Sequence, residues 1–289
     1  MQLGSLTRLF RRETRTYSGR LFLASAEGRG QDVVFIHGLA ASPHCWEQAP
    51  ELLGPRVRCH FIHIRGFAGE APSPNRKSGD FLKPLADELA VYLKLHTKGD
   101  VAIVGHSMGG IVSLILARDH ADLVGRVMVL DVPAFFSMLI NPFASGGAMA
   151  SFAEATRRRY VENDQASFEG HLRSAAEKLA MNPSSVERII QWGITSDRQM
   201  TADVMAEVMT TDLRPDLGKI KAPVEVIYAW DRSGPATRSG LDQVYASSYS
   251  TLANLQRLRI DNSRHYIMFD QPEALYHALH EWLFAVPTS

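Results

Sequence analysis

The 289-residue sequence has little cysteine, no excess of either charge and no long apolar run. Its two cysteines, Cys45 and Cys59, are too few for a disulfide framework, and the apolar run around Cys59 favours a buried free thiol. Lysine plus arginine and aspartate plus glutamate both number 31, so the net charge of zero gives no electrostatic argument for a nucleic-acid partner. No apolar run approaches the length of a membrane span, so we expect no stable membrane insertion and a cytoplasmic location.

The first fifteen residues are basic rather than apolar. They carry Arg8, Arg11, Arg12 and Arg15 and lack the uninterrupted apolar block of a secretory signal. A solvated, partly frayed terminus is the simpler interpretation, and a membrane-surface or targeting role is the alternative. The rest of the composition, 45% hydrophobic and 21% charged, is that of an ordinary globular protein with one large domain, with or without an insertion.

One stretch, residues 101–111, carries the strongest signal in the sequence. It reads Val-Ala-Ile-Val-Gly-His-Ser-Met-Gly-Gly-Ile, an apolar run of strand length followed by Gly105 and Gly109 on either side of Ser107. Helix-forming residues continue to 117, so the expected order is strand, tight turn and helix. This is the context in which a Gly-x-Ser-x-Gly turn presents a nucleophilic serine. We therefore predict that Ser107 is a nucleophile.

A serine nucleophile needs a histidine that accepts its proton and an acid that orients the histidine. In folds with this turn the chain order is serine, acid, histidine, and both partners follow strands. An expected strand at 224–228 leads to Asp231, and another at 255–260 leads to His265. We predict Asp231 as the acid and His265 as the base, with Asp131, after the strand at 126–130, as the alternative acid.

The loop at 37–42 follows a buried strand-like run at 32–36 and is made of small residues after His37. In hydrolase folds of this kind, one oxyanion-hole donor comes from such a loop and the other from the residue after the serine. That predicts the backbone N–H groups of Leu39 and Met108 as the donors. His37 and His106 have no carboxylate or cysteine at ligand spacing, so we expect packing or turn hydrogen bonds there and no metal.

Strands and helices alternate as far as residue 130, which predicts an α/β sheet with helices on both faces. Other expected elements are a hairpin at 14–24, a helix at 43–53 capped by Ser42, and helices at 78–95, 236–248 and from 272 to about 284. Between 133 and 221 no strand is convincing, and helical patterns occupy 148–163, 167–180, 184–192 and 201–210. The many large apolar residues of this segment predict a helical lid over Ser107 and an apolar portion in the substrate.

These motifs together resemble the α/β-hydrolase superfamily over nearly the whole chain. The resemblance rests on the His37-Gly38 loop, the loop at 65–69, the turn at 105–110, Asp231, and His265 ahead of residues 270–272. It implies an eight-stranded, mostly parallel sheet, a core of residues 1–132 and 222–289, a helical cap at 133–221 after the sixth strand, and no cofactor. Tyr228 and Arg264 depart from the pattern, because many members carry glycine at these positions.

The function expected from these parts is hydrolysis of a small or medium, largely neutral carboxylic ester through an acyl-enzyme intermediate. The partner is then a small apolar ester, and the oligomeric state is left open. A carbon–carbon bond hydrolase, a lactonase or an amidase would use the same serine and histidine. A non-catalytic small-molecule receptor and a serine-dependent lyase or acyltransferase are further alternatives.

Overall fold

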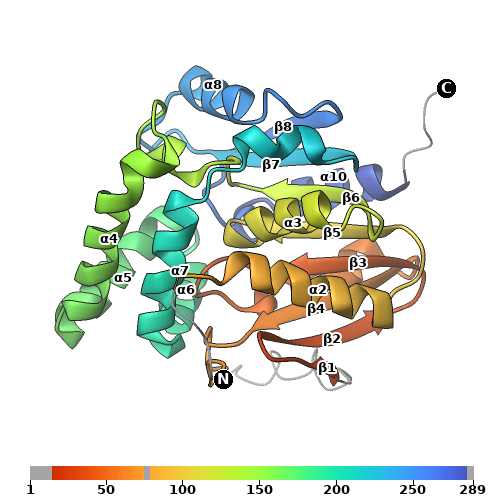
Figure 1. Cartoon of the computed structure of the whole chain (residues 1–289), viewed down its shortest axis with the longest axis horizontal. Coiled ribbons are helices and arrows are strands. Elements are labelled where there is room, and N and C mark those ends of the chain that lie inside the picture. Colours follow the sequence, from red (N-terminus) through yellow and green to blue (C-terminus); the bar gives the residue numbers. More distant parts are fainter. Residues whose placement is uncertain (1–14, 75–78, 285–289) are drawn as a thin grey trace.

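The computed structural model describes residues 15–74 and 79–284, and its centre is an eight-stranded sheet (Figure 1). The strand order is β1-β2-β4-β3-β5-β6-β7-β8. Their bounds are β1 Arg15–Ser18, β2 Phe22–Gly28, β3 Gln31–Ile36, β4 Val57–Ile64, β5 Val101–His106, β6 Val124–Leu130, β7 Val224–Trp230 and β8 Leu255–Asp261. β1 and β2 form the expected hairpin, β2 pairs antiparallel with β4, and the remaining neighbours are parallel. The predicted mostly parallel sheet is confirmed.

Helices cover both faces of the sheet, as parallel strands buried on two sides require. On one face, α2 (Leu82–His96), α3 (Met108–Asp119) and α8 (Arg238–Ser248) share an apolar core with the sheet. On the other face, α1 (Ala49–Leu53), α9 (Ile267–Asp270) and α10 (Pro272–Phe284) form a second core. The carboxyl ends of the central strands therefore lie between two well-packed layers, which gives a rigid base for side chains at that edge.

Two expected helices differ from the prediction. The helix at 43–53 is two pieces, the 3₁₀ turn η2 (Pro43–Trp46) and α1, because Pro50 has no N–H to continue a helix and its ring crowds the preceding turn. Ser42 still caps the first piece by accepting from the His44 N–H. Helix α2 begins at Leu82 rather than at 78. At this start the Glu207 carboxylate accepts the backbone N–H groups of Phe81 and Leu82 at 2.8 and 2.9 Å. A cap from a distant helix leaves no local signal.

The segment between β6 and β7 contains helices joined by loops, and it contains no strand; all of its residues are among those described. It contains η3 Phe136–Leu139, α4 Gly146–Glu162, α5 Gln165–Leu179, α6 Pro183–Thr195, α7 Arg198–Thr210 and η4 Arg214–Lys219. The side chains of Asp164, Asn182 and Asp197 cap α5, α6 and α7 by accepting backbone N–H groups that have no acceptor within their helices. In Figure 1 the helices α4 to α7 stand together beside one edge of the sheet. The predicted domain boundaries, 1–132 with 222–289 and 133–221, stay a prediction.

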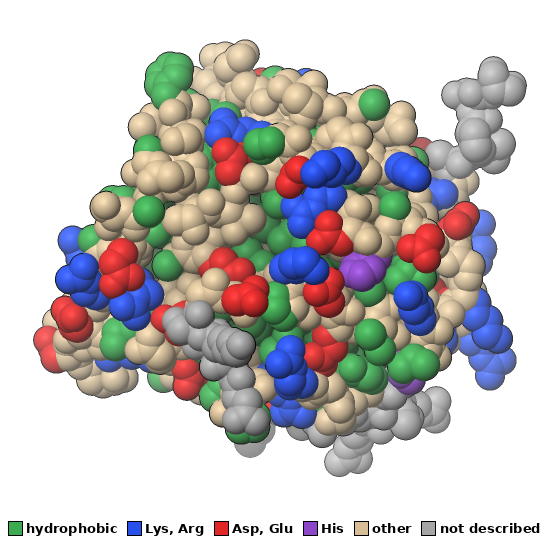
Figure 2. Space-filling model, viewed as in Figure 1, with side chains coloured by type: hydrophobic (Ala, Val, Ile, Leu, Met, Phe, Trp, Pro, Cys, Tyr) green, Lys and Arg blue, Asp and Glu red, His purple; other side chains and the backbone are tan. Residues whose placement is uncertain are grey.

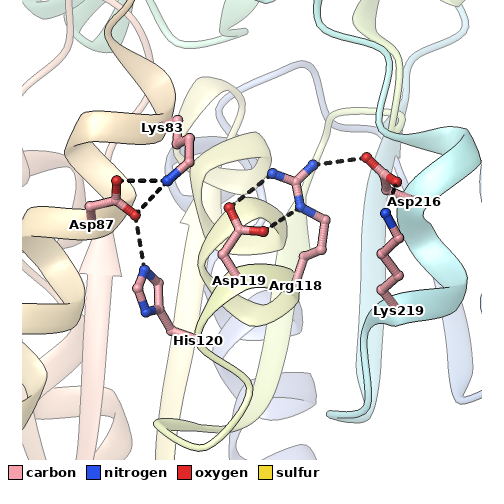
Figure 3. A network of polar contacts seen from close by, with 7 residues as sticks. All are labelled: Lys83, Asp87, Arg118, Asp119, His120, Asp216 and Lys219. Atoms are coloured by element: carbon pink, nitrogen blue, oxygen red, sulfur yellow. Dashed lines mark hydrogen bonds and ion pairs between the residues drawn. The ribbon is translucent and has the colours of Figure 1, made fainter.

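Charges of both signs are interspersed on the face that carries α2 and α3 (Figure 2). On this face, α2, α3 and η4 are joined by polar side chains (Figure 3): Lys83, Asp87, Arg118, Asp119, His120, Asp216 and Lys219. Because most of these ion pairs are partly or fully exposed, each contributes only about 0.2–1 kcal/mol. Within the described residues, no helix is both long enough and apolar enough to cross a membrane. Arg8, Arg11 and Arg12 lie outside the described residues.

Candidate active site

Ser107 lies at the sharp turn between β5 and α3, as its motif predicts. Its backbone has φ +55° and ψ −122°, a conformation that L-residues rarely adopt and that neighbouring packing must hold in place. The Ser107 N–H donates to the Leu130 carbonyl at 2.8 Å, which fixes the turn to the end of β6. Within the described residues, the Ser107 hydroxyl forms no hydrogen bond, and this includes His265, which lines the same cavity.

The glycines of the turn are required by close backbone approaches. A Cβ on Gly105 would lie 2.3 Å from the Gly109 carbonyl oxygen, and a Cβ on Gly109 would lie 2.3 Å from the Ile36 carbonyl oxygen. Real Cβ atoms do not come this close to backbone atoms. The two glycines therefore allow α3, β3 and the serine turn to meet at the carboxyl edge of the sheet.

The predicted oxyanion donors both border the space beside Ser107. Leu39 and Met108 line a cavity of about 180 Å³ together with Ser107 and His265. Met108 is the first residue of α3, so its N–H has no acceptor within the helix. Neither N–H group donates a hydrogen bond to any described residue. Two unpaired backbone donors near a serine hydroxyl are what an oxyanion needs.

His265 follows β8 and reaches the same cavity. Its Nδ1 lies 2.8 Å from Oδ2 of Asp131, the residue directly after β6. Because a carboxylate oxygen only accepts, Nδ1 carries the proton, and Nε2 of a neutral ring is left as an acceptor. Asp131 has a φ of +51°, a left-handed conformation in which its N–H donates to the Ile227 carbonyl at 2.8 Å.

Asp231, the acid that we favoured from the sequence, makes different contacts. Its Oδ2 accepts from Arg264 Nε at 3.0 Å, and its carboxylate also accepts from the Ser233 hydroxyl and N–H. Hydrogen bonds from Ser233 and then Arg264 hold the pKa of Asp231 below its ordinary value. Asp231 therefore does not form the expected pair with His265, because its carboxylate accepts from Arg264 instead. The alternative acid, Asp131, is the one at His265.

Asp131 is held by two further donors that the sequence did not point to. Its Oδ1 accepts from the Ala229 N–H at 2.9 Å and from the Tyr245 hydroxyl at 3.2 Å. Tyr245 comes from α8 and is buried against Tyr228, with ring centroids 4.2 Å apart. Burial, followed by the nearby Asp131, raises the pKa of Tyr245 well above its ordinary value, so its hydroxyl keeps its proton.

The two histidines considered as metal ligands have hydrogen bonds of their own. His37 Nδ1 donates to the Gly38 carbonyl at 2.8 Å and Nε2 accepts the Ile64 N–H at 3.1 Å, and burial lowers the pKa of His37 to about 3. His106 Nε2 donates to the His265 carbonyl at 3.0 Å, which ties the serine turn to the histidine loop. Within residues 15–74 and 79–284, no three His, Cys, Asp or Glu side chains are grouped to hold a metal.

A second, larger cavity also borders His265. Its volume is about 680 Å³, and its walls include Asp131, Trp230, Asp231 and Arg264. The smaller cavity beside Ser107 is lined on its cap side by apolar side chains, among them Phe136, Met205 and Val208.

Comparisons with known proteins agree with this architecture. A model of the alpha/beta hydrolase family matches residues 33–278. The chain is 31% identical over 110 residues to a pimeloyl-[acyl-carrier protein] methyl ester esterase of Vibrio vulnificus, an alignment that covers 38% of this chain and 40% of the relative. It is 22% identical over 263 residues to an (E)-2-((N-methylformamido)methylene)succinate hydrolase of Acinetobacter baylyi, covering 90% of this chain and 93% of that one.

Among solved structures, the fold is similar to that of a hydrolase from Pseudomonas aeruginosa. The TM-score is 0.74 at 18% sequence identity, and the match covers 96% of this chain and 100% of the other. The family match and the esterase and hydrolase relatives support a hydrolase. Because the family model spans most of the sequence, from β3 into α10, the protein belongs to the alpha/beta hydrolase family.

Proposed function

We propose that this protein is a serine hydrolase that cleaves a small or medium, largely neutral carboxylic ester. Ser107 is the nucleophile, His265 the base, Asp131 the orienting acid, and the N–H groups of Leu39 and Met108 the oxyanion donors. The observation that carries the proposal is the 2.8 Å hydrogen bond between Asp131 and His265, whose ring borders the cavity of Ser107. An orienting acid is what makes a histidine a useful base for a serine hydroxyl.

The reaction then runs in two similar halves. In the first, His265 Nε2 takes the proton of Ser107 as its oxygen attacks the ester carbonyl, and the Leu39 and Met108 N–H groups stabilise the oxyanion. The protonated His265, stabilised by Asp131, gives the proton to the departing alkoxide, and an acyl-enzyme remains. In the second half, water replaces the serine as nucleophile, and the carboxylic acid leaves. Atoms and charges balance with the protein's own groups and water.

The lining of the cavity supports the substrate class. The cap residues that face Ser107 are apolar and offer no charged group to the substrate, so a neutral, apolar acyl group fits best. His37 and His106 are buried, and burial lowers the pKa of both, so neither adds a charge beside the serine at neutral pH. In this proposal residues 133–221 act as the cap over the site.

The test combines burst kinetics on p-nitrophenyl acetate with intact-mass labelling by a fluorophosphonate. Wild type should turn over the ester and gain one label, while Ser107→Ala should lose both and His265→Ala should lose orders of magnitude in rate. Ser247→Ala, at an exposed serine of α8, is the matched control and should behave as wild type. A folded wild type that neither labels nor turns over esters would overturn the proposal and favour a non-catalytic receptor. Product analysis separates hydrolysis from acyl transfer.

A further inference from the structure

The loop that carries His265 is joined to the C-terminal end of the cap helix α5. We call this joint the α5 seam and define it as residues 177–181 of the cap and 264–270 of the core. The Arg264 guanidinium donates to the Glu177 and Ala180 carbonyl oxygens, and the Tyr266 N–H donates to the Leu179 carbonyl at 2.9 Å. A cation at the C-terminus of a helix also interacts favourably with the helix dipole.

Core residues hold Arg264 from the other side. Its Nε donates to Asp231 at 3.0 Å and its NH2 group to the Ser233 hydroxyl at 3.1 Å. The Asp270 carboxylate links the two halves of the seam separately from the guanidinium. It accepts the backbone N–H of Arg264 at 2.8 Å and the backbone N–H of Met181 at 2.9 Å. The planar guanidinium of Arg264 can donate at once to the two α5 carbonyl oxygens and to the oxygens of Asp231 and Ser233. A lysine ammonium, which is a single point charge, cannot match this geometry. The Arg264 side chain therefore adds two hydrogen bonds to α5 beside the Tyr266–Leu179 and Asp270–Met181 links of the seam.

Residues of the α5 seam line both cavities. Leu179 and Tyr266 line the 180 Å³ cavity beside the serine, while Lys178 and Arg264, from the same two segments, line the 680 Å³ cavity. His265 borders both cavities. Each half of the seam thus contributes one residue to each cavity, which is what a wall shared by two cavities requires.

We propose that the α5 seam limits the size of the ester that reaches Ser107, and that Arg264 is the specificity-determining residue that keeps it closed. This inference rests on the proposed ester hydrolysis. The cavity beside Ser107, about 180 Å³, has about a quarter of the volume of the neighbouring cavity, about 680 Å³. We expect a short acyl group to fit the smaller cavity and an eight-carbon acyl group to need part of the larger one. The closed seam therefore selects short-chain esters.

The experiment compares kcat/KM for p-nitrophenyl acetate and p-nitrophenyl octanoate. In Arg264→Ala, loss of the hydrogen bonds to α5 should open the wall, and the octanoate-to-acetate ratio should rise about tenfold or more. Leu179→Ala thins the same wall without touching the arginine, and it should shift the ratio in the same direction. Arg232→Ala removes an exposed arginine from a neighbouring loop and should leave the ratio unchanged.

If Arg264 had a purely structural role, its loss would lower kcat/KM for both esters by the same factor. The octanoate-to-acetate ratio would then be unchanged. An unchanged ratio in Arg264→Ala and Leu179→Ala, with wild type active on acetate, would overturn the partition and leave the proposed hydrolysis standing. If Arg264→Ala does not fold, Leu179→Ala alone decides by the same criterion. A wild type inactive on both esters would instead overturn the hydrolase proposal itself.

Discussion

Replacing Asp131 by asparagine tests which acid orients His265. Oδ1 of Asp131 accepts from the Ala229 N–H and the Tyr245 hydroxyl, while Oδ2 faces His265 Nδ1 at 2.8 Å. The backbone N–H of Ala229 can only donate, so in Asp131→Asn it selects the amide oxygen for the Oδ1 position. The NH2 group then turns toward Nδ1. Nδ1 must become the acceptor, the ring proton moves to Nε2, and His265 can no longer take the proton of Ser107.

A wrong tautomer of this kind costs about 10⁴-fold in kcat, or about 5.4 kcal/mol of transition-state stabilisation. Asp231→Asn should cost less than about fivefold, because it only weakens an ion pair with Arg264 and leaves an oxygen for the guanidinium. The assay is steady-state hydrolysis of p-nitrophenyl acetate by both variants, with thermal unfolding as a check on folding. The reverse order, with Asp231→Asn the more damaging, would refute the assignment of Asp131 and restore Asp231.

Three further predictions concern the supports of the site. Tyr245→Phe removes one of the donors to Asp131 and should lower kcat by roughly threefold to tenfold without changing KM; equal kinetics would mean that the hydroxyl does not position the acid. Gly109→Ala places a Cβ 2.3 Å from a backbone oxygen and should cost about 2 kcal/mol or more in unfolding free energy, whereas Gly147→Ala, with open space around it, should not destabilise. The pKa of His37 in the folded state is about 3, so as the pH falls below 6.5 only the unfolded state binds a proton at this histidine. The free energy of unfolding therefore decreases as the pH falls. Between pH 7 and pH 5 this loss is about 2 kcal/mol, and denaturant unfolding of His37→Gln should lack it.

The elements at the centre of the sheet could be predicted from the sequence because their signals are local. The apolar run of β5, the glycines around Ser107 and the strand before His265 are each readable within about ten residues. The break of the expected helix at 43–53 could also have been predicted, since Pro50 has no backbone N–H to donate to the preceding turn. Propensity and spacing were enough wherever the deciding contacts lie close in sequence.

Local sequence signals did not decide which aspartate pairs with His265. Asp131 and Asp231 follow neighbouring parallel strands, so both end at the same edge of the sheet, and the choice depends on side-chain partners across the fold. Arg264 engages Asp231 over 33 positions of sequence, and Tyr245 donates to Asp131 over 114. Arg264 in place of a glycine was a visible departure, and its meaning depended on where the guanidinium points. Long-range contacts of this kind leave no periodic or compositional trace.

The position of Asp131 after β6 also has a consequence for synthesis of the chain. The serine turn and Asp131 both precede the helical insertion, and His265 follows β8, the last strand of the sheet. Because the N-terminal residues of a nascent chain are made first, the proposed nucleophile and acid are present while α4 to α7, β7, α8 and β8 are being made. The proposed base, His265, is made only after β8, so the activity that we propose can begin only once all eight strands have been made.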